Sequence, residues 1–479
     1  MAYRYGNRSQ AALFPACVED YVAADAPVRA YDAIVEALDL AALGIAWDPD
    51  QVGNSAYDPR AMLKLLVYGY SYGVRSSRKL ERECHNNVTF MWLVGGLTPD
   101  HKTIAEYRRR HRQALKRVLG QCAQICVRLE LIAGNVLFMD GSRLRANASI
   151  QHSWTVERAT EALAEIEGRI ERLLADCEAA DQQEQETGSL VRMPAELQDA
   201  EVLRTKVTAI LQELAQGERS SFNTTDPDCS RMHSRQGNHA GYTGQIVVDD
   251  QHGLIVQGDV VSANHDWGQF TPQLRQAHET LGHCCAVACA DAGYAEYQDL
   301  AAWDGGPTDV IVPSPRQVQR ADAGPFGKSR FVYDAEADAY RCPAGQYLHF
   351  HGFERERKRR NYVAGGAVCR ACAHFGRCTT NAVSGRKVTR LAAEETRARL
   401  ERRYVQADAQ AIYRRRKGRV EHQFGHLKRN LRAGYFLLRG LAGVRAEWSL
   451  LTCVFNVVRM IGMLGVPTLV ARLATVHMG

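Results

Sequence analysis

The stretch VLFMDGSRL, residues 136–144, decides the fold of this chain. It begins with four apolar residues and then places a carboxylate, Asp140, in front of a glycine. The stretch HCCAVACADAGY, residues 283–294, repeats the pattern with Asp291, which is followed by a small residue and a glycine. Continuous apolar runs of this kind are typical of strands buried within a sheet. We therefore expect two buried strands that each end on an acid, at the edge of the sheet where α/β proteins usually carry their functional site.

Three further strands are predicted around these two. The runs at 242–250 and 253–261 are separated by two residues, as in a hairpin, and DVIVP at 309–313 supplies a fifth strand. A helix is expected around 267–281. The order strand, strand, strand, helix, strand, helix, strand, insert, helix is that of an RNase H-like α/β core, a mixed five-stranded sheet with helices.

The other parts of the chain are predicted to be helical or irregular. Apolar residues recur at three- and four-residue steps on both sides of the polar ADQQEQETGSL, which indicates an antiparallel helical hairpin at 155–217. Residues 316–400 are expected to be irregular. The apolar segment 450–467 contains Asn456 and Arg459 and is shorter than the roughly 20 residues of a membrane span, so we expect a buried helix.

Charge is distributed unevenly. The chain carries +6, but residues 157–217 hold 14 acids and 6 bases, a net of −8, so the remainder carries +14. A basic body favours a polyanionic partner such as DNA, although solubility alone also explains it. One helix, from Ile104 to Val118 and preceded by the helix-start signal TPD, is crowded with bases. Those expected to contact DNA are Arg108, Arg109, Arg110 and Arg112, with a solvated helix face as the alternative.

These features divide the chain into consecutive segments. We expect an all-α, helix-turn-helix-like DNA-binding domain at 1–130, the first core strand at 131–154, an inserted helical hairpin at 155–220, the rest of the core sheet at 221–315, a basic cysteine-bearing insert at 316–400, and the last core helices at 401–479. No stretch near the N-terminus resembles a signal peptide, so a cytoplasmic location is expected.

A third acid is expected from the late helix, AIYRRRKGRVEHQFGHLKRNLR at 411–432. Glu421 is the only acid in this stretch, and Lys417 and Lys428 lie on its face of a helix. Carboxylates gathered at one edge repel one another unless a cation joins them, and Mg²⁺ or Mn²⁺ is the natural choice for oxygen ligands. Taken singly, each acid also fits a turn, a cap or a salt bridge. The competing acids are Asp226, Asp228, Asp249 and Asp266, of which the first two fit a turn.

Asp140 in MDGSRLRANAS, Asp291 in ADAGY and Glu421 in YRRRKGRVEHQFGHLK together resemble the three acids of bacterial insertion-sequence DDE transposases. The resemblance covers nearly the whole chain. TPDHKTIAEYRRRH is similar to the DNA-binding domain that precedes the catalytic core in one branch of this family.

The late helix of related transposases carries Tyr, Arg, Glu and Lys at fixed steps. Tyr413, Arg416, Glu421 and Lys428 match in type and order, but the step from Arg to Glu is one residue longer than in the best-known variants. Either Lys417 takes the part of the arginine or the signature is looser in this chain.

The resemblance implies a DNA transposase that uses two Mg²⁺ or Mn²⁺ ions. Asp140 would bridge both ions, and Asp291 and Glu421 would each hold one. Lys428 would neutralise a phosphate and Tyr413 would lie close to the DNA ends. The implied partners are terminal inverted repeats, target DNA and a second copy of the chain in the synaptic complex, with no membrane. A non-catalytic DNA-binding regulator and a stand-alone RNase H-like nuclease are the alternatives.

Four cysteines form a second pattern. Their spacing, with a C-x₂-C pair, is similar to that of a small zinc ribbon, and His374 could replace one thiolate. They are Cys342, Cys369, Cys372 and Cys378. A structural Zn²⁺ there would hold a basic excursion near DNA; four buried or loose thiols are the alternative. The excursion carries Arg355, Arg357, Lys358, Arg359 and Arg360.

Overall fold

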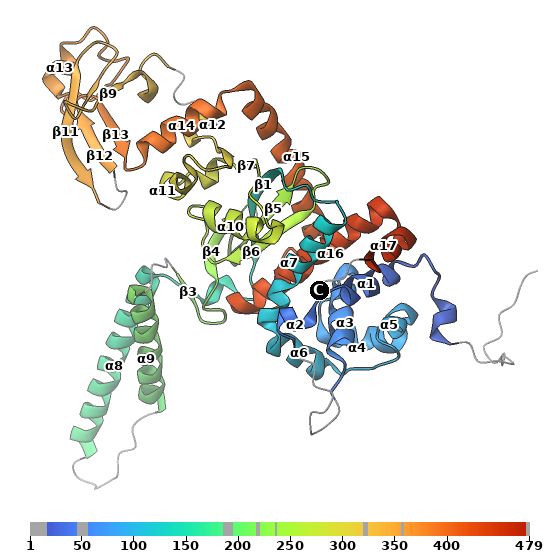
Figure 1. The fold of residues 1–479 in the computed structure, drawn as a ribbon. Coiled ribbons are helices and arrows are strands. Elements are labelled where there is room, and N and C mark those ends of the chain that lie inside the picture. The colour runs from blue at the N-terminus through green and yellow to red at the C-terminus, as the bar shows by residue number, and fades with distance from the viewer. Residues whose placement is uncertain are drawn as a thin grey trace, which may run out of the picture.

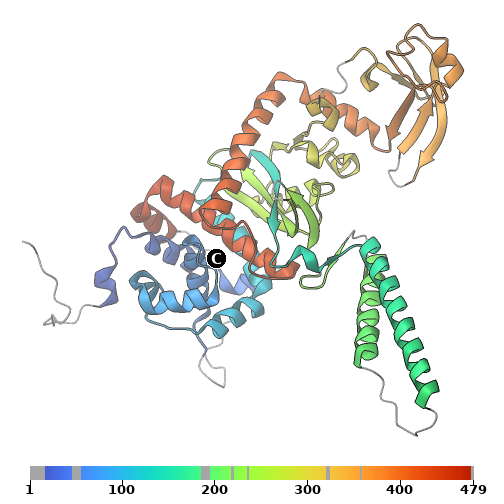
Figure 2. The same ribbon diagram turned by 180° about the vertical axis from the view of Figure 1, so that it is seen from behind.

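A central mixed sheet, a helical N-terminal region and two projecting units make up the protein (Figures 1 and 2). The computed structural model describes residues 17–45, 56–184, 195–216, 221–234, 237–319, 324–355 and 359–475. Of the residues singled out above, Arg357 and Lys358 lie outside the described residues. The predicted fold class, a mixed sheet with helices and a helical N-terminal region, is confirmed in this form.

The N-terminal region is helical throughout its described part. Its elements are η1 (Val18–Tyr21), α1 (Pro27–Glu36), α2 (Leu40–Leu43), α3 (Pro59–Ser71), α4 (Ser77–Asn86), α5 (Val88–Leu93), α6 (His101–Arg110) and α7 (Arg112–Arg128). A helix begins where the sequence TPD predicts it. The carboxylate of Asp100 accepts the backbone N–H of Thr103 at 2.8 Å and so caps α6. The single helix predicted from Ile104 to Val118 is wrong, because the chain leaves helical geometry at His111 and continues as a separate α7.

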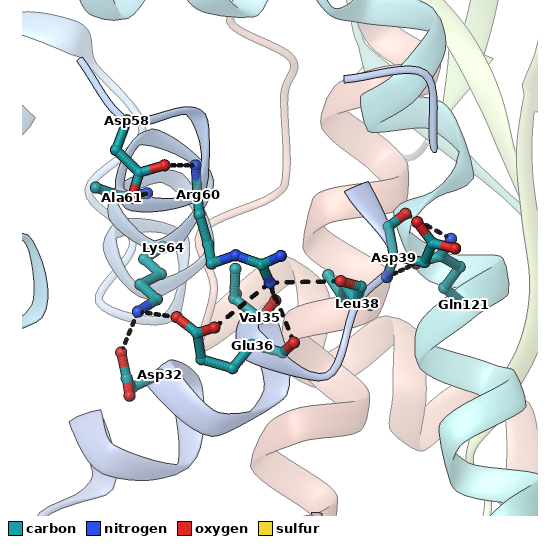
Figure 3. Close-up of polar contacts among 10 residues, drawn as sticks. All are labelled: Asp32, Val35, Glu36, Leu38, Asp39, Asp58, Arg60, Ala61, Lys64 and Gln121. Carbon is teal, nitrogen blue, oxygen red and sulfur yellow. Dashed lines mark hydrogen bonds and ion pairs between the residues drawn. The ribbon is translucent and has the colours of Figure 1, made fainter. Parts of the chain in front are cut away.

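Polar side chains tie these N-terminal helices together (Figure 3). Lys64 on α3 places its Nζ 2.6 Å from the carboxylates of both Asp32 and Glu36 on α1. The Arg60 guanidinium donates to the carbonyls of Val35, at 2.9 Å, and Glu36, at 3.1 Å, at the C-terminal end of α1, where carbonyls lack their usual partners in the next helical turn. A cation there also suits the negative end of the helix dipole.

The central sheet has the order β4-β5-β1-β7-β8, with β6 also pairing with β5. Its strands are β1 (Val136–Arg145), β4 (Ser230–Ser234), β5 (Gly237–Asp249), β6 (Ile255–Val261), β7 (Val287–Cys289) and β8 (Asp309–Ile311). The pairs β1–β7 and β7–β8 are parallel, and the other pairs are antiparallel. Five strands were predicted; the sixth, β4, was missed because SRMHS has one apolar residue and no alternation to mark it.

Helix α16 (Leu441–Leu464) runs through the hydrophobic core and contains most of the apolar segment 450–467 predicted to be one buried helix; the segment is broken at Gly465, after which a separate helix begins. Its Trp448 is fully buried and donates its indole N–H to the carbonyl of Gln245 on β5 at 3.1 Å. Among the described residues α16 is the one helix long and apolar enough to cross a membrane, but 67% of its most apolar window is buried within the protein. Burial of that extent is what a core helix shows. Helices α10 (Phe270–Leu281), α15 (Ala407–Arg429) and α17 (Val466–Leu473) complete the body.

Two units project from this body. The first is the pair of long helices α8 (Val156–Glu184) and α9 (Ala195–Gln216), which lie side by side between β2 (Ser153–Trp154) and β3 (Phe222–Asn223) (Figures 1 and 2). They share their own small core, which includes Ala159, Ile166 and Val207. Because the two helices bury their apolar faces against each other, the hairpin can project from the body without exposing those faces to solvent.

The second unit is an antiparallel sheet of order β13-β12-β11-β10-β9, where an irregular segment was expected. Its strands are β9 (Val332–Asp334), β10 (Ala339–Arg341), β11 (Tyr347–Glu354), β12 (Arg359–Val363) and β13 (Lys387–Leu391). The expectation was wrong because these strands are short and mostly polar, and only a few of their side chains, among them Tyr340, Leu348 and Tyr362, form a core. Helix α13 (Gly366–Arg370) precedes β13, and α12 (Pro315–Gln319) and α14 (Glu394–Tyr404) connect this sheet to the body.

A buried ion pair joins the N-terminal region to the core. The Nη1 atom of Arg75 lies 2.7 Å from Oε1 of Glu447 on α16, and both side chains are buried. Arg75 also donates to the carbonyls of Arg432, at 2.6 Å, and Tyr435, at 2.9 Å. Burial raises the pKa of Glu447, while Arg75 opposes that rise. The helical N-terminal region is therefore packed into the protein rather than tethered to it.

Replacing Glu447 with Gln should destabilise the fold strongly. The substitution leaves the Arg75 guanidinium buried without its counter-charge, a change that typically costs about 3–5 kcal/mol of unfolding free energy. Urea unfolding followed by circular dichroism measures it. Glu106→Gln, which removes the exposed partner of Arg109, is the control and should leave the unfolding midpoint nearly unchanged. Equal midpoints for the two variants would contradict the role given to Glu447.

Candidate active site

Asp140 lies within β1, not at its end as predicted. The antiparallel pairing of β1 with β5 continues to Arg145, whereas its parallel pairing with β7 stops at Phe138. The acid therefore sits just beyond the last residue that the neighbouring parallel strand covers. Asp291 follows the end of β7 by two residues and accepts the backbone N–H of Gly293 at 2.8 Å.

The two acids converge on one cation, Arg416 of α15. Its Nη1 lies 3.6 Å from Oδ2 of Asp140, and its Nη2 lies 3.9 Å from Oδ2 of Asp291. The Arg416 side chain is only 12% exposed, and among the described residues its Nε and Nη1 have no hydrogen-bond partner. Burial raises the pKa of Asp140 to about 7; Arg416 opposes this, and Asp291 adds to it. The cluster is therefore short of positive charge.

A third carboxylate, Asp266, lies beside this pair. The Nε2 of Gln245 on β5 donates to its Oδ1 at 2.6 Å, and Tyr294 in turn donates its hydroxyl to Gln245. Burial raises the pKa of Asp266, and the charge on Asp291 raises it further. The sequence named Asp266 as a competing acid, but nothing in the flanking SANHDWG marked it as close to Asp291.

The glycines that follow the two predicted acids make room for this third carboxylate. A Cβ at Gly141 would overlap Oδ1 of Asp266, and one at Gly293 would lie 2.9 Å from Oδ1 of Asp291 and 3.3 Å from Oδ2 of Asp266. A side chain at either glycine would therefore displace a carboxylate. The small residues after each acid were the sequence signal for this crowding.

The structure does not bring Glu421 into the cluster. Its side chain is 63% exposed on α15 and forms an ion pair with Nζ of Lys417 at 3.9 Å. Within the described ranges, no group of three or more His, Cys, Asp or Glu side chains is arranged to hold a metal ion. Where the sequence predicts a third acid, the structure instead has the guanidinium of Arg416 against the first two.

Two other predicted residues of α15 face the acids. The Nζ of Lys428 donates to Ser142 Oγ at 2.5 Å and to the carbonyl of Arg143 at 3.3 Å; burial lowers its pKa, and Asp140 opposes that change. The ring of Tyr413 lies 5.6 Å from the Arg416 guanidinium. Lys417 is 75% exposed and points elsewhere, so Arg416 is the one of the two candidates that lies at the acids.

The predicted DNA-contacting arginines separate into two groups. Arg108 is 6% exposed and donates to the carbonyl of Arg75 at 2.7 Å and to Ser77 Oγ. This burial is at odds with the predicted DNA contact, since the guanidinium is used inside the fold. Arg109, Arg110 and Arg112 are exposed, and Arg109 pairs with Glu106 at 2.6 Å.

The four predicted zinc ligands lie around one small cavity beside the second sheet. Its volume is about 30 Å³, and Cys342, Cys369, Cys372, Cys378 and His374 all line it. Backbone N–H groups point at two of the sulfurs, from Gln346 to Cys342 at 3.3 Å and from Arg386 to Cys369 at 3.2 Å. Such N–H···S bonds stabilise thiolate ligands. The set of sulfurs fits Zn²⁺ chemically, but the described side chains do not form a coordination group, so zinc stays a prediction.

Comparisons with known proteins match both ends of the chain. Residues 16–110 match a family model described as a transposase domain (DUF772), and residues 341–461 match one described as a transposase DDE domain. The second match includes Arg416, Glu421 and Lys428, but not Asp140 or Asp291. No curated protein and no solved structure matches the chain. Both matches are to transposase domains, and together they support an insertion-sequence DDE transposase.

Proposed function

We propose that this transposase binds the terminal inverted repeats of its insertion sequence and catalyses metal-dependent strand cleavage and strand transfer, as in cut-and-paste transposition. The observation that carries the proposal is the convergence of Asp140 and Asp291, from adjacent parallel strands, on Arg416 of the helix that also carries Glu421 and Lys428. Strand order supports an RNase H-like core, since β6-β5-β1-β7-β8 is a mixed sheet in which β5 runs antiparallel to both neighbours.

Asp140 and Asp291 are the residues that would hold divalent cations. Their carboxylates are hard oxygen donors, and they share one guanidinium as counter-charge, so the donor chemistry fits Mg²⁺ or Mn²⁺. A bound pair of ions would activate the attacking oxygen and stabilise the leaving oxygen of the phosphodiester. By resemblance Glu421 completes the ligand set, whereas Asp266 is the acid already beside Asp291.

The side chains around the acids have separate tasks. Lys428 holds a positive charge next to Ser142, within the influence of Asp140, where it can neutralise a phosphate as a point charge. Tyr413 keeps the Arg416 guanidinium beside its ring. Gln245 fixes the orientation of Asp266 through its amide N–H. Among the predicted N-terminal contacts, Arg109, Arg110 and Arg112 are exposed for the DNA backbone.

Asp140→Ala should abolish strand cleavage and leave binding to terminal repeats intact. The substitution removes the most buried acid of the pair while α6 and α7 remain untouched. Cleavage of a labelled terminal-repeat duplex in Mg²⁺, run beside a band shift of the same DNA, measures both properties. Asp176→Ala, on the projecting hairpin, is the matched control and should cleave normally. Binding without cleavage by the wild type would favour the regulator, and cleavage without strand joining would favour the nuclease.

Glu421→Gln and Asp266→Asn should separate the two candidates for the third acid. If Glu421 is the ligand, its variant loses cleavage completely, whereas Asp266→Asn, as an outer partner, loses about 10–100-fold. Single-turnover cleavage with saturating DNA measures both rates. The reverse order would assign the third ligand to Asp266 and make Glu421 a surface residue paired with Lys417.

Without divalent cations, the stability of the protein should fall as pH rises from about 4 to about 7. The ordinary pKa of an Asp carboxyl is 3.8 and that of Asp140 in the fold is about 7. The folded protein thus binds this proton more tightly than the unfolded chain, and the advantage is lost as the carboxyl ionises. Asp140→Asn should therefore raise the melting temperature at pH 8 and change it little at pH 4. Mg²⁺ should raise the melting temperature of the wild type at pH 8 but not that of the variant; the same Mg²⁺ response in both would remove Asp140 from the metal site.

A further inference from the structure

A second concave surface is lined by residues of the second sheet and of the helices α12 and α14. Figure 1 shows where these elements lie. This surface consists of two neighbouring cavities, of about 560 and 710 Å³, that share Arg316 and Lys328 in their walls. We call it the basic groove, after the cations that line it. They are Arg316, Lys328, Arg377, Arg386, Lys387, Arg390, Arg397 and Arg402.

The acids of the groove do not balance these cations. Glu394 is paired with Lys328, whose Nζ lies 2.6 Å from its Oε1, and also with Arg397. Glu401, the other acidic residue in the wall, lies 3.8 Å from Nε of the same Arg397. Both carboxylates are therefore already paired, Glu394 with Lys328 and Arg397, and Glu401 with Arg397.

Among the described residues, four cations of the groove have neither a counter-charge nor a hydrogen bond, whereas Arg386, which also lacks a carboxylate partner, donates to the carbonyls of Cys378 and Phe326. The four are Arg316, Arg377, Lys387 and Arg402. Over the ranges that the structure describes, none of these side chains forms an ion pair or a hydrogen bond. Lys328 shows the effect of its surroundings on its pKa. Burial and the neighbouring Arg397 lower that pKa to about 8, and the charge of Arg316 lowers it further. A surface with four free cations in one groove is complementary to a polyanion.

Aromatic rings are interleaved with the cations. The half-buried rings of Tyr333 and Tyr404 line the larger cavity, and the Arg390 guanidinium lies 3.8 Å from the centre of the Tyr333 ring. Phe331 and Tyr340, in the same wall, belong to the buried core of the second sheet. Cations alternating with flat apolar faces are typical of nucleic-acid surfaces, because phosphates and bases are contacted together. An acidic peptide would need no such rings.

The groove is connected to the acid cluster through two tyrosines. Tyr404, in the groove wall, packs edge-on against Tyr413 with ring centroids 5.1 Å apart. Tyr413 lies beside Arg416, which contacts Asp140 and Asp291. A row of contacts, from Tyr404 through Tyr413 to Arg416, therefore links the groove wall to the acids.

We propose that the basic groove binds the phosphodiester backbone of DNA next to the bond that is cut, with Arg316, Lys387 and Arg402 among its phosphate contacts. This inference rests on the proposed function, because it assumes that the acids act on DNA. If DNA binds in this way, the second sheet contributes to DNA binding independently of the acids.

The test is DNA binding by the full chain with the four free cations changed to Gln. The variant carries Arg316→Gln, Arg377→Gln, Lys387→Gln and Arg402→Gln. The control removes four exposed bases from the projecting hairpin, with Arg169→Gln, Arg172→Gln, Arg204→Gln and Lys206→Gln. The probes are a fluorescein-labelled duplex of random sequence and its separated strand, read by anisotropy at several salt concentrations in EDTA. Thermal unfolding verifies that both variants fold.

The groove variant should bind about 10–100-fold more weakly and lose about 3–4 from the slope of log affinity against log salt. The control should bind as the wild type does. A loss on the duplex places duplex DNA in the groove, and a loss on the separated strand alone places an unpaired strand there. Wild-type affinity in the groove variant, or an equal loss in the control, overturns the proposal. A wild type that binds neither probe also overturns the proposal. The proposed function fails separately, when the wild type does not cleave the terminal-repeat duplex in Mg²⁺, so the two failures are distinguishable.

Discussion

The buried carboxylate of Glu447 connects the parts of this protein that have to act together. It forms an ion pair with Arg75 of the N-terminal region. It also accepts hydrogen bonds from the backbone N–H groups of Leu437, at 3.0 Å, and Leu438, at 2.9 Å, in the loop that follows α15. That loop also holds the end of β1, since Phe436 donates to the carbonyl of Arg145 at 2.8 Å. The strand that carries Asp140 and the helix that carries Arg416 are thus both fixed by a loop that one buried acid organises. A charge so deeply buried is retained only where its partners are complete.

The sequence was sufficient for the features that rest on long apolar runs. Asp140 and Asp291 were predicted close together because each follows an apolar run, and the structure places both against Arg416, although Asp140 lies within β1 rather than at its end. It was insufficient where polar residues decide the structure. Arg108 looks like its neighbours in RRRHR, yet only its guanidinium turns inward to the carbonyl of Arg75, a contact 33 residues away. The second sheet was missed because its core depends on isolated rings such as Tyr340 and Tyr362.

Arg416 explains how two buried acids are tolerated in the same place. Carboxylates that share a site repel each other, and burial alone would keep one of them protonated. A guanidinium delocalises its charge over a plane and reaches both acids at once, at 3.6 and 3.9 Å. Neither distance is that of a short charge-assisted hydrogen bond, so the pairing is loose. A loose pairing with a monovalent group is one that a divalent cation can replace, since the cation binds both acids more strongly.

The exposure of Glu421 follows from the way α15 packs against the core. The face of α15 that packs on the sheet is fixed by Val420, Phe424 and Leu427, so the helix cannot rotate to bring another residue inward. Asp266 is already ordered by Gln245, whereas Glu421 has to give up side-chain freedom worth up to about 2 kcal/mol before it can act as a ligand. That cost is small beside the attraction between a carboxylate and a divalent cation. As the proposed third ligand, Glu421 would leave solvent only when a cation is bound, whereas Asp140 and Asp291 are already held together by Arg416.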